Sequence, residues 1–352
     1  MAKDKGIQKI ERKSGTGFGK YVKGLIAVAI LGLAASSITL MVGDIRENLA
    51  AFSKVRYDWF SIGIAAMIGF WLLDSFLFKE LCRGLGMRFS LFQSIHISLL
   101  GQFYSAITPF ATGGQPMQIY AMYKRGQKVS QSSAVFIAKF LLYQSVITIY
   151  GIFVLWISFS DVRMETPRLS LLAIGGFIVN SGAIFFMMLF AFSKRATTAI
   201  LLGISSWFRW SRPGKKVYHW MEGFVVKLES FYQAMRQVYR NPIQILSLFL
   251  LTLCQMFFFF SVSYCTYRAL GYSSAPFWEI LAFQGVVFLV ISFIPLPGAS
   301  GAAESGFFLF FQRFFSRPDL AAAILLWRLV SYYLNIIVGG VCALRERKMN
   351  RV

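Results

Sequence analysis

TPFATGGQP (residues 108–116) and PLPGASGAAE (residues 295–304) are the two segments that decide the fold of this sequence. Each interrupts a long apolar run, the first within residues 91–123 and the second within residues 277–315. Proline removes a backbone donor and glycine weakens a helix, so the chain should leave the helix at both segments. Unpaired backbone groups cost on the order of several kcal/mol each in hydrocarbon. We therefore predict two helical hairpins whose turns lie beside a protein-lined or water-filled cavity.

The composition is that of a membrane protein. Hydrophobic residues make up 57% of the chain and charged residues 14%, with a mean hydropathy of +0.59, which is too apolar for one soluble core. A hydrocarbon core about 30 Å thick needs about 20 apolar residues per helix. The candidate spans are residues 24–42, 59–78, 134–159, 169–192, 243–267 and 320–344. We interpret residues 24–42 as an uncleaved first span, because the run is longer than a signal-peptide core and more spans follow.

The basic residues sit in short segments between the apolar runs. Lys and Arg number 36 against 15 Asp and Glu, and the distribution follows the positive-inside rule more closely than a nucleic-acid-binding pattern. Residues 1–23, the amphipathic segment 193–241 and the tail 345–352 are then cytoplasmic, and each interrupted run begins and ends on one side. The predicted fold is an all-α integral membrane protein, in which residues 24–344 form six full transmembrane helices and two opposed re-entrant hairpins, resembling an inverted repeat.

The residues of the two turns are the first candidates for a binding site. Glycine lets a headgroup approach the backbone, and the start of a returning half-helix offers free N–H groups to a phosphate. The alternative is that the glycines only pack two helices closely and the prolines only kink them. The candidates are Gly113, Gly114, Gln115 and Gln118 in the first hairpin and Pro297, Gly298 and Gly301 in the second.

Charged residues inside the predicted spans are the second group of candidates. A charge at the bilayer centre costs about 2.5–3.5 kcal/mol on insertion scales, so each should face the interior and have a partner. We expect Glu304 to pair with Arg328, either as a structural lock or as a site that opens for a phosphodiester. Lys139 either binds a headgroup or extends to the interface, and Asp74 either caps its helix or pairs locally with Lys79.

No metal or cofactor site is expected. His96 and His219 have no companions at catalytic or metal-ligand spacing, and the four cysteines are scattered without a CxxC pair. Within residues 217–239, apolar residues recur at helical spacing beside basic ones. This pattern predicts an interfacial helix that either packs on the inner face of the bundle or recruits lipid.

The sequence resembles the flippase-like transmembrane region of lysylphosphatidylglycerol synthases, the multiple peptide resistance factor family. The motifs that carry the resemblance are Thr108-Pro109 with Gly113-Gly114-Gln115-Pro116, Pro295-x-Pro297-Gly298 with Gly301-x-x-Glu304, and Arg328-Leu-Val-Ser-Tyr-Tyr. Two positions differ from the family pattern: Lys139 followed by Tyr143-Gln144, where an arginine and an acidic partner are expected, and Asn335, where a proline is common.

The resemblance implies movement of an aminoacylated phosphatidylglycerol, or of another phosphate-linked or polyprenyl-linked lipid, between leaflets. The soluble acyltransferase-like domain of the synthases has no counterpart in this sequence, so we expect no lysyl transfer by this chain alone. The alternatives are phosphatidylglycerol lysyltransferase activity with a partner chain, and a small-solute transporter or scaffold. The expected partners are an anionic or aminoacylated membrane phospholipid and a second copy or a separate lipid-modifying enzyme, without nucleic acid. We expect a multi-pass protein of the bacterial cell (plasma) membrane with both termini cytoplasmic.

Overall fold

A computed structural model describes residues 52–160, 167–200, 228–292 and 294–349, and this part of the chain is helical without strands. Five helices in it are long and apolar enough to cross a membrane. They are α4 (Tyr57–Gly84), α7 (Val129–Ser160), α8 (Pro167–Phe192), α11 (Pro242–Ala269) and a last span made of α14 (Arg317–Arg328), the π-helical η3 (Leu329–Tyr333) and α15 (Leu334–Met349). The sixth predicted span, residues 24–42, lies outside the described residues.

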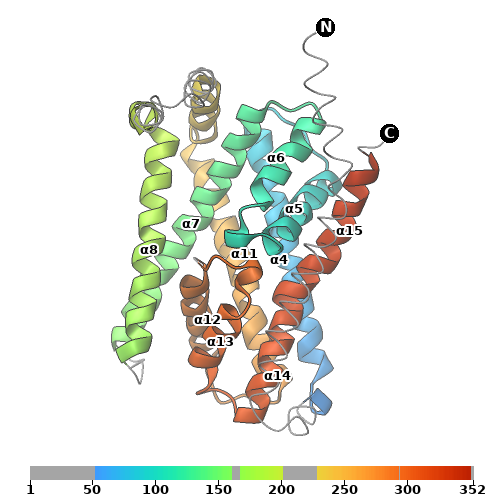
Figure 1. Cartoon of the computed structure of the whole chain (residues 1–352), viewed down its shortest axis with the longest axis vertical. Helices are drawn as coiled ribbons and strands as arrows, with labels where there is room; N and C mark the ends of the chain where they lie inside the picture. Colours follow the sequence, from blue (N-terminus) through green and yellow to red (C-terminus); the bar gives the residue numbers. More distant parts are fainter. Residues whose placement is uncertain (1–51, 161–166, 201–227, 293, 350–352) are drawn as a thin grey trace, which may run out of the picture.

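Both predicted interruptions are present as helix–turn–helix hairpins. The first consists of α5 (Leu91–Ala106), η1 (Pro109–Ala111) and α6 (Gly114–Lys124), and the second of α12 (Phe277–Ile291), η2 (Pro297–Ala299) and α13 (Ala302–Phe311). The hairpins enter the bundle from opposite ends, and η1 contacts η2 near half its height (Figure 1). The two short turns, which lie far apart in the sequence, therefore share one location in the fold.

The connections fall at the two ends of the bundle as the charge pattern predicted. The α4–α5 and α6–α7 connections, the end of α8, the start of α11 and the end of α15 all lie at one end (Figure 1). The end of α7, the start of α8, and the α11–α12 and α13–α14 connections lie at the other. Each interrupted run therefore begins and ends at the same end of the molecule.

The two turns begin with nearly the same backbone conformation and differ at their ends, where Gly113 has a φ of −78° and Gly301 a φ of 86°. Thr108 and Leu296 precede them with φ/ψ of −118°/145° and −117°/146°. Phe110 and Gly298 then occupy the left-handed region at 53°/18° and 58°/17°. Both sequences read Pro-x-Ala-(Thr/Ser)-Gly, and in each the hydroxyl donates to the carbonyl of the turn proline at 2.9 Å. The repeat thus extends from topology to individual hydrogen bonds.

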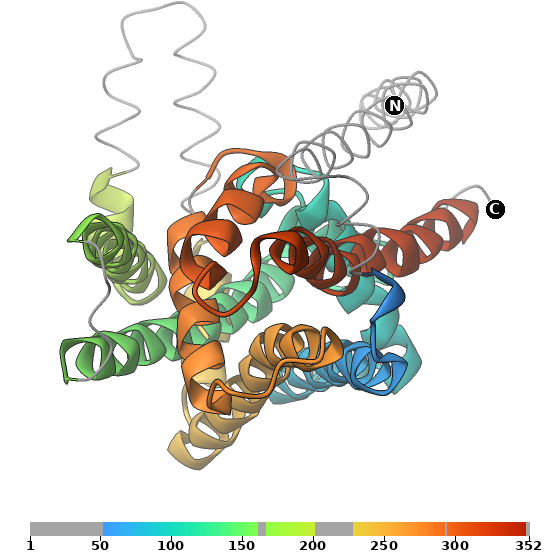
Figure 2. The same ribbon diagram turned by 90° about the horizontal axis from the view of Figure 1, so that it is seen from below.

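Long helices hold the hairpins in place. α4 packs along α11, α5 along α15, and α12 against α7 and α8. Seen from below, α8 lies at the periphery while α12 and α13 lie closer to the middle (Figure 2). α4 and α11 both end in an Arg-x-Leu-Gly sequence whose glycine has a positive φ, 75° at Gly86 and 87° at Gly271, which stops the helix before the hairpin begins.

The described half of the predicted amphipathic segment packs on the bundle. Residues 228–238 are helical, and Leu228, Phe231 and Met235 are buried in a cluster that includes Leu81 and Ala191. On the exposed side Glu229 accepts a hydrogen bond from Lys194 at 2.5 Å, and this bond, together with the charge of Lys194, lowers the pKa of the carboxyl group. Of the two alternatives predicted for this helix, packing on the bundle explains the apolar face of residues 228–238. Residues 217–227 lie outside the described part.

The repeat offers a matched test of why the second turn uses glycine. An added Cβ at Gly298 would come within 2.1 Å of the Tyr332 ring, whereas Phe110 carries a side chain at the same φ and is 54% exposed. We expect Gly298→Ala to lower the free energy of unfolding by about 1–3 kcal/mol through overpacking. Phe110→Ala should change it by less than about 0.5 kcal/mol.

Thermal unfolding of the two purified variants in detergent measures the difference. Equal stability of Gly298→Ala and the wild-type protein would show that the contact between η2 and the last span does not require glycine.

Candidate functional site

A cavity of about 580 Å³ lies where the two turns meet. Its walls come from both hairpins and from α4, α7, α8, α11 and the last span, so it is central to the bundle. Aromatic and aliphatic side chains form part of the lining, and three charged residues, Asp74, Lys139 and Arg328, form another part. Uncharged polar residues complete it: Gln102, Ser105, Gln115, Gln118, Gln144, Asn180, Gln255, Ser292, Ser331 and Asn335. A mixed lining with convergent polar groups is typical of a ligand site.

Arg328 and Glu304 form the predicted pair. Arg328 Nε donates to Glu304 Oε1 at 2.7 Å, and both residues are 4% exposed. Nη2 of the same guanidinium donates to the Gly298 carbonyl at 3.1 Å, while Glu304 Oε2 accepts from the Gly301 N–H at 2.6 Å. The pair therefore caps α13 and holds the second turn against the last span. Glu304 itself does not line the cavity, whereas Arg328 does.

Asp74 and Lys139 form a second buried pair. The Lys139 ammonium lies 2.8 Å from the Asp74 carboxylate, and Gln255 Nε2 donates to Asp74 Oδ1 at 2.9 Å. Asp74 is 2% exposed. Both alternatives predicted for Asp74, a helix cap and a local pair with Lys79, are wrong, because Asp74 lies within α4 and faces α7 and α11 inside the bundle. Lys139 likewise points at an interior partner, so the alternative in which it extends to the interface is also wrong.

The two cations occupy equivalent places in the repeat. Lys139 lies 30 residues after Pro109 and Arg328 lies 31 residues after Pro297, each in the helix that follows its hairpin. Their carboxylate partners differ in origin, since Asp74 comes from the helix before the first hairpin and Glu304 from within the second. The cavity is thus lined by one lysine and one arginine from opposite halves of the fold.

The predicted glycines have two different roles: some allow close helix packing, and one allows a left-handed backbone conformation. An added Cβ at Gly114 would come within 2.1 Å of Ser105 Oγ, and one at Gly113 within 2.6 Å of Thr108, so both allow α6 to approach α5. Gly301 has open space around its missing Cβ and a φ of 86°, so its role is conformational. Of the predicted turn residues, the cavity lining includes Gln115, Gln118 and Gly298 and does not include Gly113, Gly114, Pro297 or Gly301.

Gln115 and Gln118 differ in the freedom of their side chains. Gln118 is buried, packs against Gly101 and donates to the Ile97 carbonyl at 3.0 Å, which ties α6 to α5. Gln115 is exposed at the start of α6. Gln115 is therefore the more accessible of the two amides.

Three residues of the last span and α4 were not among the sequence candidates. Tyr332 packs on Gly298 and donates from its hydroxyl to the Ala106 carbonyl at 3.2 Å, so it bridges the two hairpins. Trp71 Nε1 donates to Asn335 Oδ1 at 2.7 Å, and Asn335 donates to the Ser331 carbonyl. Tyr332 follows Arg328 by four residues, one helical turn, and that spacing could have indicated it.

The cavity reaches the surface beside the turns. Phe110, Ala111, Gln115 and Leu296 belong to its lining and are exposed, with Leu296 at 45%. Two of these are large apolar side chains at half the height of the bundle. The opening therefore exposes large apolar side chains beside one amide, whereas the charged residues lie in the interior.

His96 has a partner that its sequence neighbourhood does not reveal. Its Nε2 lies 2.7 Å from Glu346 Oε2, 250 residues along the chain, and Arg125 binds the same carboxylate. The described residues contain no group of three or more His, Cys, Asp or Glu side chains arranged for a metal ion. The cysteines of the described part are free thiols.

These features define a polytopic helical membrane protein with two opposed, turn-to-turn hairpins around a charged central cavity. The chain belongs to the family described as lysylphosphatidylglycerol synthase TM region, whose model matches residues 24–339. It is similar to a UPF0104 membrane protein of Archaeoglobus fulgidus, at 26% identity over 88% of this chain and 94% of the relative. It is also similar to a Mycoplasma pneumoniae protein described as an uncharacterized MG306 homolog, at 21% identity over 97% of this chain and 91% of the relative.

The Asp74–Lys139 pair should stabilise the fold. Asp74→Asn leaves the Lys139 ammonium without a counter-charge, and we expect a loss of about 3 kcal/mol in the free energy of unfolding. Asp74→Asn combined with Lys139→Gln should recover most of that loss, because the second substitution removes the uncompensated charge.

Thermal unfolding in detergent measures both effects, with Lys79→Gln as the control for local pairing. A loss in Lys79→Gln as large as that in Asp74→Asn would contradict the arrangement.

Proposed function

We propose that this chain moves a phosphate-linked membrane lipid between leaflets through its central cavity. The observation that carries the proposal is the placement of Arg328 and Lys139 in one cavity beside two turns that approach from opposite ends. In this arrangement the hairpins are re-entrant, the headgroup enters between them, and the acyl chains stay in the bilayer. Access from the two leaflets alternates as one half of the repeat moves against the other.

The guanidinium of Arg328 supports phosphate binding. An arginine carries five N–H donors, and within the described residues two of them have acceptors, Glu304 Oε1 and the Gly298 carbonyl. The other N–H groups can meet phosphate oxygens while the pair with Glu304 stays in place. A planar guanidinium suits this task because it binds a phosphate through two parallel hydrogen bonds.

Two further residues of the cavity lining support a headgroup that also donates hydrogen bonds. Gln255 Oε1 and Asn180 Oδ1 are buried and have no hydrogen-bond partner among the described residues, and both residues line the cavity. Such acceptors gain from a hydroxyl or ammonium group, because a buried carbonyl oxygen without a partner costs about 1–3 kcal/mol. A phosphodiester that carries a glycerol, sugar or aminoacyl group combines both features. An anionic or aminoacylated phospholipid is therefore the proposed substrate class.

The apolar opening supports a route for the acyl chains. Phe110 and Leu296 are exposed at the turns, at the depth where a re-entrant hairpin faces the middle of the bilayer. A charged headgroup can then cross in the cavity while its chains remain in hydrocarbon, which avoids the cost of placing the charge in lipid.

Leaflet exchange in reconstituted liposomes tests this function. Dithionite quenches only the fluorophores of the outer leaflet. In liposomes that contain the full chain and a trace of fluorescent phosphatidylglycerol, the fluorescence lost on adding dithionite should exceed the outer-leaflet share, because labelled lipid moves outward from the inner leaflet. The variant with Glu304→Gln and Arg328→Gln keeps a neutral hydrogen-bonding pair and should slow exchange by about tenfold or more, because a charge-assisted hydrogen bond contributes about 1.5–3 kcal/mol.

Lys128→Gln is the matched control, since it removes an exposed cation outside the cavity and should leave the rate unchanged. No exchange above protein-free liposomes for several anionic and aminoacylated lipids would overturn the proposal. Wild-type exchange in the Glu304→Gln, Arg328→Gln variant would show that the cavity is not the route.

A further inference from the structure

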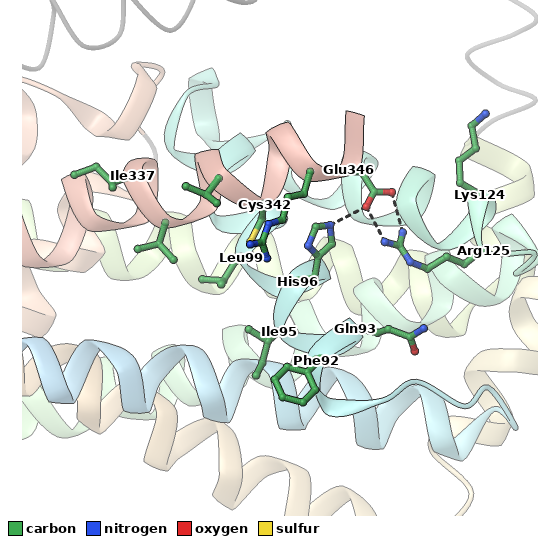
Figure 3. Close-up of a pocket in the computed structure, with 13 residues that line it drawn as sticks. Phe92, Gln93, Ile95, His96, Leu99, Lys124, Arg125, Ile337, Cys342 and Glu346 are labelled. Carbon is green, nitrogen blue, oxygen red and sulfur yellow. Dashed lines mark hydrogen bonds and ion pairs between the residues drawn. The ribbon is translucent and has the colours of Figure 1, made fainter. Parts of the chain in front are cut away.

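A second cavity, of about 840 Å³, lies between α5 and α15 at the end of the bundle where α15 terminates (Figure 3). None of the residues that line it lines the central cavity. We call this second cavity the α5–α15 groove. Along α15 its apolar lining residues, Ile337, Val338 and Val341, come before the charged Arg345 and Glu346.

One part of the α5–α15 groove is apolar. Phe92, Ile95 and Leu99 follow one another at helical spacing on α5, and Ile337, Val338 and Val341 do so on α15. Phe92 is 85% exposed, and Ile337 and Val341 are 59% and 51% exposed, so the walls present open hydrocarbon. The two helices touch at Gly339, where an added Cβ would come 2.5 Å from the Leu99 carbonyl oxygen. The two helices are therefore in contact at Gly339, and the exposed apolar residues beside that contact leave an open groove.

The other part of the groove is cationic. Arg125 binds both oxygens of Glu346 at 2.9 and 2.7 Å, and His96 contacts the same carboxylate. Lys124 and Arg345 also line the groove, are exposed, and have no ion pair among the described residues. Figure 3 shows the Lys124 side chain pointing away from the Arg125–Glu346 pair. The lining thus carries three Lys or Arg cations against one carboxylate, which leaves net positive charge.

We propose that the α5–α15 groove is a binding site for an anionic phospholipid, separate from the transported substrate. One acyl chain lies along the apolar walls and the phosphate meets Lys124 and Arg345. From Ile337 to Glu346 the groove follows ten residues of α15, and the nine rises between them span roughly 14 Å at 1.5 Å per residue. The bound lipid joins the first hairpin to the helix that continues from Arg328.

Charge and shape together favour a lipid over other occupants. A free phosphate would use the cations and leave Phe92, Ile337 and Val341 uncovered. A zwitterionic lipid would cover the walls but carries no net charge for Lys124 and Arg345. Basic residues near a membrane surface attract anionic lipids in particular. The inference does not rest on the proposed transport, because it requires binding alone.

Photo-crosslinking of a lipid to the full chain tests the site. The protein is placed in phosphatidylcholine nanodiscs with a trace of phosphatidylglycerol or of phosphatidylcholine, each carrying a diazirine on one acyl chain, and adducts are mapped by peptide mass spectrometry. We expect phosphatidylglycerol adducts within residues 92–99 and 337–342. Lys124→Gln with Arg345→Gln should reduce their yield by about tenfold. Val341→Trp should reduce it too, because the ring fills the apolar part.

Two matched controls separate groove effects from general ones. Arg88→Gln with Lys128→Gln removes the same charge from exposed residues of the same end, and Leu344→Trp adds the same ring to an exposed position of α15 outside the lining. Both should keep the wild-type yield. The proposal would be overturned by equal adduct yields for the two lipids or by an unchanged yield in Lys124→Gln with Arg345→Gln. It would also be overturned if the variant Val341→Cys formed crosslinks to residues 1–51 or to a second copy of the chain. Loss of leaflet exchange with intact adducts would leave this site in place and count against the transport function alone.

Discussion

The structure depends on satisfying the backbone groups that two broken helices expose. At the second turn Glu304 accepts from the Gly301 N–H and Arg328 donates to the Gly298 carbonyl, so one ion pair serves both sides of the break. At the first turn Thr108 Oγ1 accepts from the Gly113 N–H at 2.8 Å. Tyr332 then donates to the Ala106 carbonyl from the opposite half of the fold. A break in a membrane helix is stable only where protein or water covers it, and here protein does much of the covering.

The repeat explains why the cavity has two cations and why they differ. Both halves supply a long helix, a hairpin with the same turn and a second long helix, so Lys139 and Arg328 arrive at corresponding places. Arg328 must also hold a turn, and a guanidinium with donors in a fixed fork can bind Glu304 and a carbonyl at once. Lys139 has no turn carbonyl among its described partners, and a single ammonium beside Asp74 is sufficient there.

The sequence predicts the interruptions because local chemistry determines them, and it predicts the Glu304–Arg328 pair because each charge within the predicted spans needs a partner. Proline and glycine break a helix wherever they occur, and a carboxylate three residues into α13 can reach back to its own helix start. It does not predict the Asp74–Lys139 or Trp71–Asn335 contacts, because periodicity gives the buried face of a helix and not the helix that packs against it. The shared Pro-x-Ala-(Thr/Ser)-Gly sequence indicates an internal repeat. Aligning the two halves on this sequence would have predicted that Lys139 corresponds to Arg328.

In the proposed transport, the pairing of both cations limits how tightly the cavity would hold a phosphate. An unpaired cation would bind a phosphodiester strongly and release it slowly, whereas a transport site must bind well enough to admit its ligand and weakly enough to let it leave. Asp74 and Glu304 already occupy one side of each cation, so a phosphate gains only the remaining donors and meets the repulsion of two carboxylates. The same carboxylates keep the empty cavity free of uncompensated charge, which would otherwise destabilise the bundle. If the chain transports a lipid as proposed, the two carboxylates serve both the stability of the bundle and the release of the ligand.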